Sequence, residues 1–140
     1  MGRTPPAWHV ALPLASLLMA ALPEAAEGPS AALRGSATFR TYCASCHGKT
    51  AHGDGPVAEH LRFAPTDLTQ IAHRNGDKFP ADKITRIIDG RDSLRGHGGT
   101  DMPVWGDVFL ESREGYDRVK VREKIEELVQ YLASLQEPRP

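Results

Sequence analysis

Both cysteines of the chain lie in one pentapeptide, Cys43-Ala44-Ser45-Cys46-His47, in which a histidine directly follows the second cysteine. On a helical turn, two cysteines three positions apart lie on one face, where their thiols can bond to the two vinyl groups of one porphyrin. The adjacent histidine can then bind the iron at the centre of that porphyrin. The spacing therefore predicts one covalently attached haem c, held by Cys43 and Cys46, with His47 as an iron ligand.

Three other uses of a C-x-x-C pair compete with haem attachment. A dithiol redox site is expected in a βαβ setting, but this sequence has no alternating strand pattern of useful length. A tetrahedral zinc site needs further ligands, and the chain has no third cysteine. A structural disulfide would suit an exported protein. None of these alternatives explains the histidine beside the pair, so haem attachment is the preferred interpretation.

The second ligand of the iron would decide the class of haem chemistry. Met102 lies far along the chain from His47 in a glycine-rich loop, and it is the only methionine after the N-terminal segment. A His/Met pair raises the reduction potential and suits electron transfer, so we expect Met102 to be the second ligand. The main rival is His97 in the same loop, which would give a lower potential. Weaker rivals are His52, His60 and His73.

The cysteine motif is expected at the end of a helix. Ser30 is a suitable N-cap for a helix that runs through Phe39 and Tyr42 to the cysteines. Gly35 lies one turn before Phe39, on roughly the same face. Its small size would let another helix come close to this one.

The last helix has the clearest periodicity. Its apolar residues recur at spacings of three and four and are Val121, Ile125, Leu128, Val129, Leu132 and Leu135. Pro138 stops the pattern. Residues 80–88 form another helix candidate that ends at Gly90, and residues 56–61 and 67–72 are shorter candidates.

Long loops separate the expected helices. Residues 48–55 and 91–103 are rich in glycine and are predicted to be loops. Loops of this length are unusual in a small domain unless something organises them, and a central haem would do so. The sequence therefore predicts an all-α fold of three to five helices, with long loops wrapped around one covalently attached haem.

The N-terminus has the pattern of an export signal. Arg3 precedes an uncharged, mostly apolar run at residues 10–22, which has the length of a signal-peptide core and is short for a membrane span. We expect residues 1–26 to be a signal peptide and residues 27–140 to be one mono-haem domain. The cleavage site is poorly defined by its local residues, so an uncleaved N-terminal anchor is the alternative. The protein is expected to be periplasmic or otherwise exported.

The charge pattern excludes one class of partner. The chain has 17 basic and 18 acidic residues, a net charge of -1 and no long run of either sign. Nucleic-acid binding through a basic face therefore has no support. The hydrophobic fraction of 40% is ordinary for one globular domain.

With these residues in place, the sequence resembles the class I cytochrome c family across residues 31–136. The matching features are Gly35 with Phe39, CASCHG at the motif, GDGP at 53–56, APTDLT at 64–69, IDG at 88–90, MPVWG at 102–106 and the final YLASLQ. The resemblance implies a cytochrome c-like fold. Its first and last helices would cross near Gly35, Phe39 and residues 128–132.

The resemblance also implies roles for residues around the haem. Met102 would be the distal ligand, and the Pro56 carbonyl would accept a hydrogen bond from the free ring nitrogen of His47 and so fix its tautomer. Trp105 would pack at the haem edge or reach a propionate. The candidate propionate partners are Arg91 and Arg95.

The expected function is single-electron transfer between redox partner proteins, without catalysis by the chain itself. The alternative is a haem-bearing electron-relay subunit of a larger respiratory or dehydrogenase complex. We therefore expect either a monomer or a subunit of such a complex. A haem sensor or peroxidase-like enzyme with a labile sixth ligand is less favoured, because no catalytic base is evident in the sequence.

Overall fold

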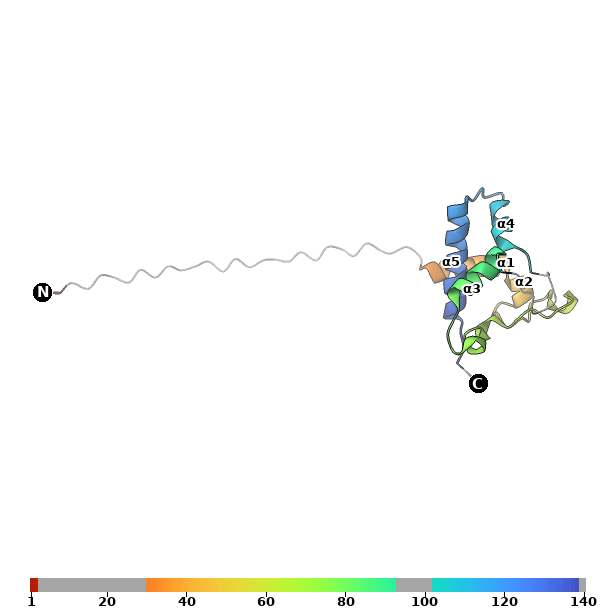
Figure 1. Ribbon diagram of the computed structural model, residues 1–140, viewed down its shortest axis with the longest axis horizontal. Coiled ribbons are helices and arrows are strands. Elements are labelled where there is room, and N and C mark those ends of the chain that lie inside the picture. Colours follow the sequence, from red (N-terminus) through yellow and green to blue (C-terminus); the bar gives the residue numbers. More distant parts are fainter. Residues whose placement is uncertain (3–29, 93–101, 139–140) are drawn as a thin grey trace.

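Helices are the regular elements of the protein (Figure 1). The computed structural model describes residues 1–2, 30–92 and 102–138. In chain order its helices are α1 (Ala31–Tyr42), α2 (Ala44–His47), the short 3-10 helices η1 (Ala58–His60), η2 (Leu68–Gln70) and η3 (His73–Asn75), then α3 (Ala81–Asp89), α4 (Trp105–Leu110) and α5 (Arg118–Ser134). No strand occurs in these three ranges, in agreement with the predicted all-α class.

Helix α1 forms where its cap and spacing predict. The Ser30 hydroxyl accepts a hydrogen bond from the Leu33 amide at 3.3 Å, which satisfies one of the unpaired amides at the start of the helix. The helix ends at Tyr42, and the amide of Cys43 donates to the Phe39 carbonyl at 2.9 Å. Helix α2 begins directly after Cys43. The cysteine motif is therefore a continuation of α1.

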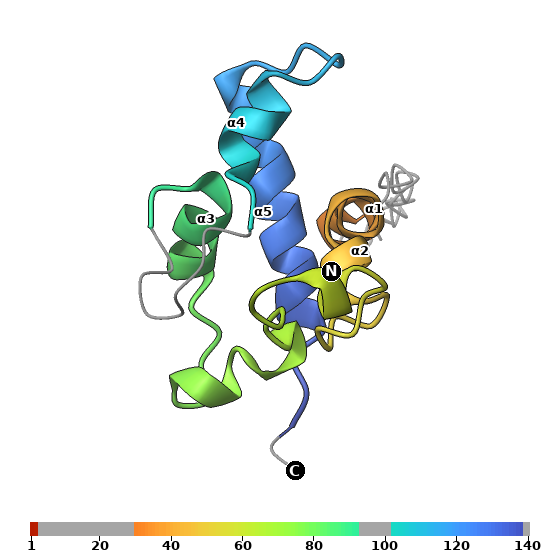
Figure 2. The same ribbon diagram turned by 90° about the vertical axis from the view of Figure 1, so that its right-hand side faces the viewer.

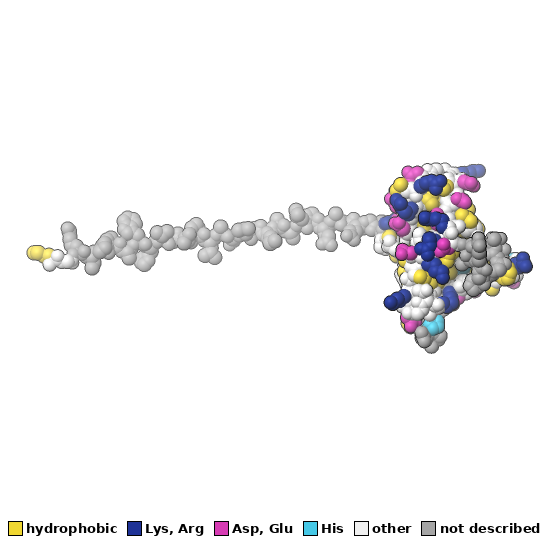
Figure 3. All heavy atoms as spheres, in the orientation of Figure 1, with side chains coloured by type: hydrophobic (Ala, Val, Ile, Leu, Met, Phe, Trp, Pro, Cys, Tyr) yellow, Lys and Arg dark blue, Asp and Glu magenta, His cyan; other side chains and the backbone are white. Residues whose placement is uncertain are grey.

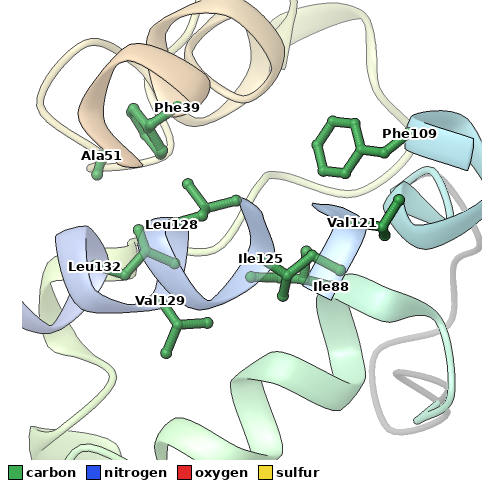
Figure 4. Close-up of a cluster of buried hydrophobic side chains, with 9 residues drawn as sticks. All are labelled: Phe39, Ala51, Ile88, Phe109, Val121, Ile125, Leu128, Val129 and Leu132. Atoms are coloured by element: carbon green, nitrogen blue, oxygen red, sulfur yellow. The ribbon is translucent and has the colours of Figure 1, made fainter. Parts of the chain in front are cut away.

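Helix α5 buries the face that its periodicity predicts. Its buried residues are Val121, Ile125, Leu128, Val129 and Leu132. They pack with Phe39 of α1, Ile88 of α3 and Phe109 of α4 into one hydrophobic core (Figure 4). Figure 2 shows α5 between α1 and α3. The long last helix is therefore the element against which the others assemble.

The backbones of α1 and α5 approach each other at Gly35. A methyl group added at Gly35 would overlap the carbonyl oxygen of Glu127, a backbone atom of α5. Arg34 and Glu127 form an ion pair at the same crossing. The small size of Gly35 thus sets how closely the two helices pack, as the sequence predicts.

Gly35→Ala is expected to destabilise the protein, although alanine is favoured over glycine in helices by about 1 kcal/mol. The added methyl group has to displace α5, and overpacking of this kind costs roughly 1–3 kcal/mol. Thermal unfolding followed by circular dichroism measures the effect. The matched control is Ala37→Gly on the exposed side of α1, which should cost about 1 kcal/mol through helix propensity alone. A Gly35→Ala variant that melts above the wild type would contradict the contact.

Between α1 and α5 the structure differs from the predicted elements. The candidates at 56–61 and 67–72 are only short 3-10 helices, η1 and η2. The candidate at 80–88 is α3, and its predicted stop is confirmed because Gly90 has a φ of 82° at the C-cap. Helix α4 was not predicted, since its 6 residues are too few to establish a periodicity.

The expected signal peptide, residues 1–26, lies almost entirely outside the described residues. In the ranges that the structure describes, no helix has both the length and the apolar character needed to cross a membrane. The signal peptide, its cleavage site and the alternative of an uncleaved anchor therefore stay predictions.

Candidate functional site

The cysteine motif forms a single helical turn. The amides of Cys46 and His47 both donate to the carbonyl of Cys43, at 3.2 and 2.9 Å. Cys43 is at once the C-cap of α1 and the N-cap of α2. The local geometry that haem attachment requires of this spacing is therefore present.

A glycine-containing loop packs tightly against this turn. Its amides donate to three carbonyls of the motif: Gly53 to His47 at 2.8 Å, Gly55 to Cys46 at 3.1 Å and Val57 to Ser45 at 3.0 Å. A methyl group added at Gly55 would overlap the carbonyl oxygens of Ser45 and Cys46. A helix as short as α2 leaves its carbonyls unpaired, so the loop both satisfies them and holds the motif in place.

A cavity of about 400 Å³ lies beside the motif. Cys43, Cys46 and His47 line it, and Met102 and Trp105 line it from a later part of the chain. Much of the remaining wall is apolar and consists of Phe39, Leu68, Ile71, Ile84, Ile87, Ile88, Leu128 and Leu132. The volume is in the range of cofactor pockets, roughly 300–1,000 Å³. Two thiols, an imidazole and a thioether around an apolar chamber are the groups that a covalent haem needs, so the residues present fit haem.

The ring of His47 is held in one orientation by the backbone. Its Nδ1 lies 3.0 Å from the carbonyl oxygen of Thr66. A carbonyl only accepts, so Nδ1 carries the proton and Nε2 has a free lone pair, as an iron ligand requires. Burial lowers the pKa of His47, and the bond to Thr66 acts in the opposite direction. The neutral form suited to binding a metal is therefore favoured.

The expectation that Pro56 supplies this acceptor is wrong. The structure gives the bond to Thr66, whereas Pro56 is exposed and is not part of the cavity wall. The neighbours of Pro56 explain the difference, because the amides of Gly55 and Val57 donate hydrogen bonds to backbone carbonyls of α2. The segment that reaches the imidazole is the later stretch 64–69, APTDLT, to which the sequence pattern assigned no role.

The Cys43 thiol lacks the lowered pKa of a reactive cysteine. Burial, with a smaller effect from the neighbouring Cys46, raises the pKa of Cys43 to about 12. Redox-active and nucleophilic cysteines have a lowered pKa instead, because the thiolate is the reactive form. The Cys43 thiol is protonated at neutral pH, which weighs against the dithiol interpretation of this pair.

Met102 is anchored next to the cavity by two close contacts of the segment that follows it. A methyl group on Gly90 would overlap the side chain of Val104, and one on Gly106 would overlap the carboxylate of Asp89. The chain after Met102 is thus packed against the C-terminal end of α3. Met102 itself is half-buried and packs against the hydrophobic core.

Trp105 belongs to an aromatic cluster at the cavity wall. Its ring centroid lies 5.6 Å from that of Tyr42 and 5.7 Å from that of Phe109, and Tyr42 and Phe109 are 5.2 Å apart. Edge-to-face and tilted pairs at these separations are stabilising. Trp105 therefore lies at the cavity wall, and its expected packing at a haem edge stays a prediction. The other expected role, contact with a propionate, stays a prediction as well.

The described rivals of Met102 do not line the cavity. His52, His60 and His73 instead lie beside acidic side chains, at 3.3 Å from Glu137, 3.4 Å from Glu59 and 3.6 Å from Asp77. The main rival, His97, lies outside the described residues.

Two cationic side chains that were not predicted as propionate partners line the cavity, Arg74 and Lys83. Of the two residues that were predicted, Arg91 is paired with Asp89 and is absent from the cavity wall. Arg95 lies outside the described residues. Arg74 and Lys83 are therefore the described cations that could offset the charge of haem carboxylates.

The segment that carries Thr66 is stabilised by Asp67, whose carboxylate accepts hydrogen bonds from the amide and hydroxyl of Thr69 at 2.8 and 2.7 Å. Partial burial raises the pKa of Asp67, but the bonds from Thr69 outweigh this effect and hold the pKa below its usual value. The stabilisation is therefore present at neutral pH, above the carboxyl pKa of the unfolded chain. It is lost as the pH falls through the lowered pKa of the folded state.

Asp67→Ala is accordingly expected to lower the free energy of unfolding by about 1 kcal/mol at neutral pH. The difference from wild type should shrink in acid, where the wild-type carboxylate is protonated. Urea denaturation across a pH series measures it. Asp67→Asn is the control, because it keeps a carbonyl acceptor but does not titrate. A difference between Asp67→Ala and wild type that is the same at every pH would contradict the role of the carboxylate.

Comparison with known families adds to this geometry. The family model described as cytochrome C oxidase, cbb3-type, subunit III, matches residues 30–119. The match runs from the cap of α1 into α5, and it includes Cys43, Cys46, His47 and Met102. The chain matches no curated protein and no solved structure. The family model covers well over half of the chain, so the chain belongs to this family of c-type cytochromes, which are electron-transfer proteins with covalently bound haem c and iron.

Proposed function

We propose that the chain is an exported mono-haem c-type cytochrome that passes single electrons between redox partner proteins, with iron ligated by His47 and Met102. The observation that carries this proposal is the shared cavity, in which Cys43, Cys46 and His47 face the same space as Met102. The expectation of export is supported by the signal-peptide pattern at residues 10–22.

The residues of the chain have distinct parts in this function. Cys43 and Cys46 would form the two thioether bonds, while Nε2 of His47 and the sulfur of Met102 would bind the iron. Bound haem iron alternates between the ferric and ferrous states and so carries one electron at a time. The apolar wall from α1, α3 and α5 would exclude water. If His47 and Met102 both bound the iron, no coordination site would be left for a substrate, which would favour electron transfer over catalysis.

Protein partners are proposed to dock at the rim of the cavity. Phe63 and Pro103 are exposed and also line the cavity, so they extend its apolar wall to the surface. Figure 3 shows Lys and Arg side chains beside Asp and Glu side chains on the face drawn, in keeping with the net charge of -1. On this face the interspersed charges do not form the basic groove that nucleic acids require, which is in keeping with the proposal of protein partners.

An electron-relay subunit of a larger complex is the second candidate. The family that matches the chain is named for a subunit of a cbb3-type cytochrome C oxidase. Affinity purification of the tagged chain from detergent-solubilised cells distinguishes the two candidates. Recovery of a stoichiometric larger partner would support the subunit, whereas a monomer in the periplasmic fraction would support the free carrier.

Visible absorption spectra of the protein, produced with a periplasmic haem-maturation system, test the main proposal. We expect covalent haem, a sharp low-spin spectrum on reduction and the weak far-red band of ferric iron with a methionine sulfur ligand. Covalent haem without that band would overturn ligation by Met102. A mature protein without covalent haem would overturn the proposal as a whole.

A further inference from the structure

The side chain of Gln136 joins the end of α5 to the segment beside the haem-binding histidine. Its Nε2 donates to the carbonyl of Leu68 at 2.9 Å and to that of Leu132 at 2.8 Å. Its Oε1 accepts from the amide of Ala72 at 2.8 Å. Leu68 is the first residue of η2, Ala72 is the N-cap of η3, and Leu132 lies in α5. One carboxamide thus fastens both ends of residues 68–72 to the last helix.

The next residue strengthens this connection. The amide of Glu137 donates to the carbonyl of Thr69 at 3.0 Å. On the opposite side, the amide of Leu68 donates to the carbonyl of Ala51 at 2.7 Å. The backbone of η2 is therefore held between the loop that follows the cysteine motif and the end of α5.

The fastened segment begins two residues after the acceptor of the His47 hydrogen bond. The carbonyl of Thr66 lies 3.0 Å from His47 Nδ1, and Leu68 is the point at which Gln136 holds the chain. A backbone hydrogen bond weakens as its distance and angle depart from the optimum. The position of Leu68 therefore limits how far the Thr66 carbonyl can move from the imidazole.

We propose that Gln136 is a positioning residue for the iron ligand His47, acting through the backbone of residues 66–72. This inference rests on the proposed function, in which His47 binds haem iron. A hydrogen bond at Nδ1 raises the basicity of an imidazole ligand, and a more basic ligand stabilises ferric over ferrous iron. Loss of the Gln136 bonds should therefore weaken the bond to Thr66 and raise the reduction potential.

The test compares Gln136→Met with wild-type holoprotein. Methionine keeps an unbranched, uncharged side chain but cannot make the three hydrogen bonds. We expect an upward shift of the midpoint potential, together with exchange of the His47 Nδ1 proton at least about tenfold faster by nuclear magnetic resonance. The matched control is Gln130→Met, the same substitution on the exposed side of α5. It should leave both quantities unchanged.

A second control separates positioning from general stability. Val121→Ala removes core packing at the other end of α5, and Val121 does not line the cavity. It should lower the melting temperature without shifting the potential. If Gln136→Met lowers the melting temperature but leaves the potential and the proton exchange unchanged, Gln136 is only structural and the inference is overturned. A wild-type protein without covalent haem would instead overturn the proposed function. The failure of the inference about Gln136 and the failure of the proposed function therefore give different results.

Discussion

Replacing both Cys43 and Cys46 with alanine is expected to give a protein without covalently bound haem. Both thiols line the cavity from a single helical turn, and the chain has no other cysteine to take their place. The loss should be complete, because thioether bonds need both a vinyl group and a thiol. Acid-acetone extraction followed by the pyridine haemochrome assay of the precipitated protein measures it.

The control for the cysteine variant is Ser45→Ala, which changes the exposed residue between the two thiols. It should bind haem covalently at the wild-type level. Each single cysteine variant should keep at most one thioether bond and lose part of its haem during maturation. Haem that resists extraction in the double variant would show that attachment occurs elsewhere.

Met102→Ala is expected to keep covalent haem but to lower the reduction potential. A thioether ligand favours ferrous iron, so its removal leaves the ferric state relatively more stable. Axial ligands shift haem potentials over a span of about 0.8 V, and we expect a fall of at least roughly 0.1 V. Potentiometric titration measures the shift, and the far-red band of the ferric protein should vanish in the same sample.

The control for Met102 is Val108→Ala on the exposed side of α4. It alters an apolar side chain near the same segment without touching the cavity, and it should change neither the potential nor the spectrum. An unchanged reduction potential in Met102→Ala would show that Met102 does not bind the iron. His97 would then be the ligand to test next.

The parts of this protein that could be predicted from its sequence are those with local causes. The N-cap at Ser30, the stop at Gly90 and the buried face of α5 follow from capping, backbone conformation and periodicity. The cysteine motif is also local, since its five residues span barely more than one turn. A close approach of another helix at Gly35 could be predicted because a small residue leaves room for a second backbone, whereas the crossing with the last helix was implied by the resemblance to class I cytochrome c.

The parts that could not be predicted depend on the path of the chain in space. Every residue has a carbonyl group, so no side-chain type distinguished Thr66 from Pro56 as the partner of His47. In the sequence, Arg74 and Lys83 cannot be distinguished from ordinary surface residues. Only the path of residues 61–88 around the cavity places them in its wall. Gln136 is a polar residue at a helix end, and its three backbone partners lie mostly far away in sequence.

The crossing of α1 and α5 also implies an order of events during maturation. The ion pair at this crossing joins residues 93 positions apart. It can therefore form only after nearly the whole domain has been synthesised. The cavity wall is incomplete before then, because Leu128 and Leu132 belong to α5. Contacts between distant residues are slow to form compared with local helices. Cys43 and Cys46 would therefore be accessible for haem attachment before α5 docks, and the docking of α5 would then complete the wall around the haem.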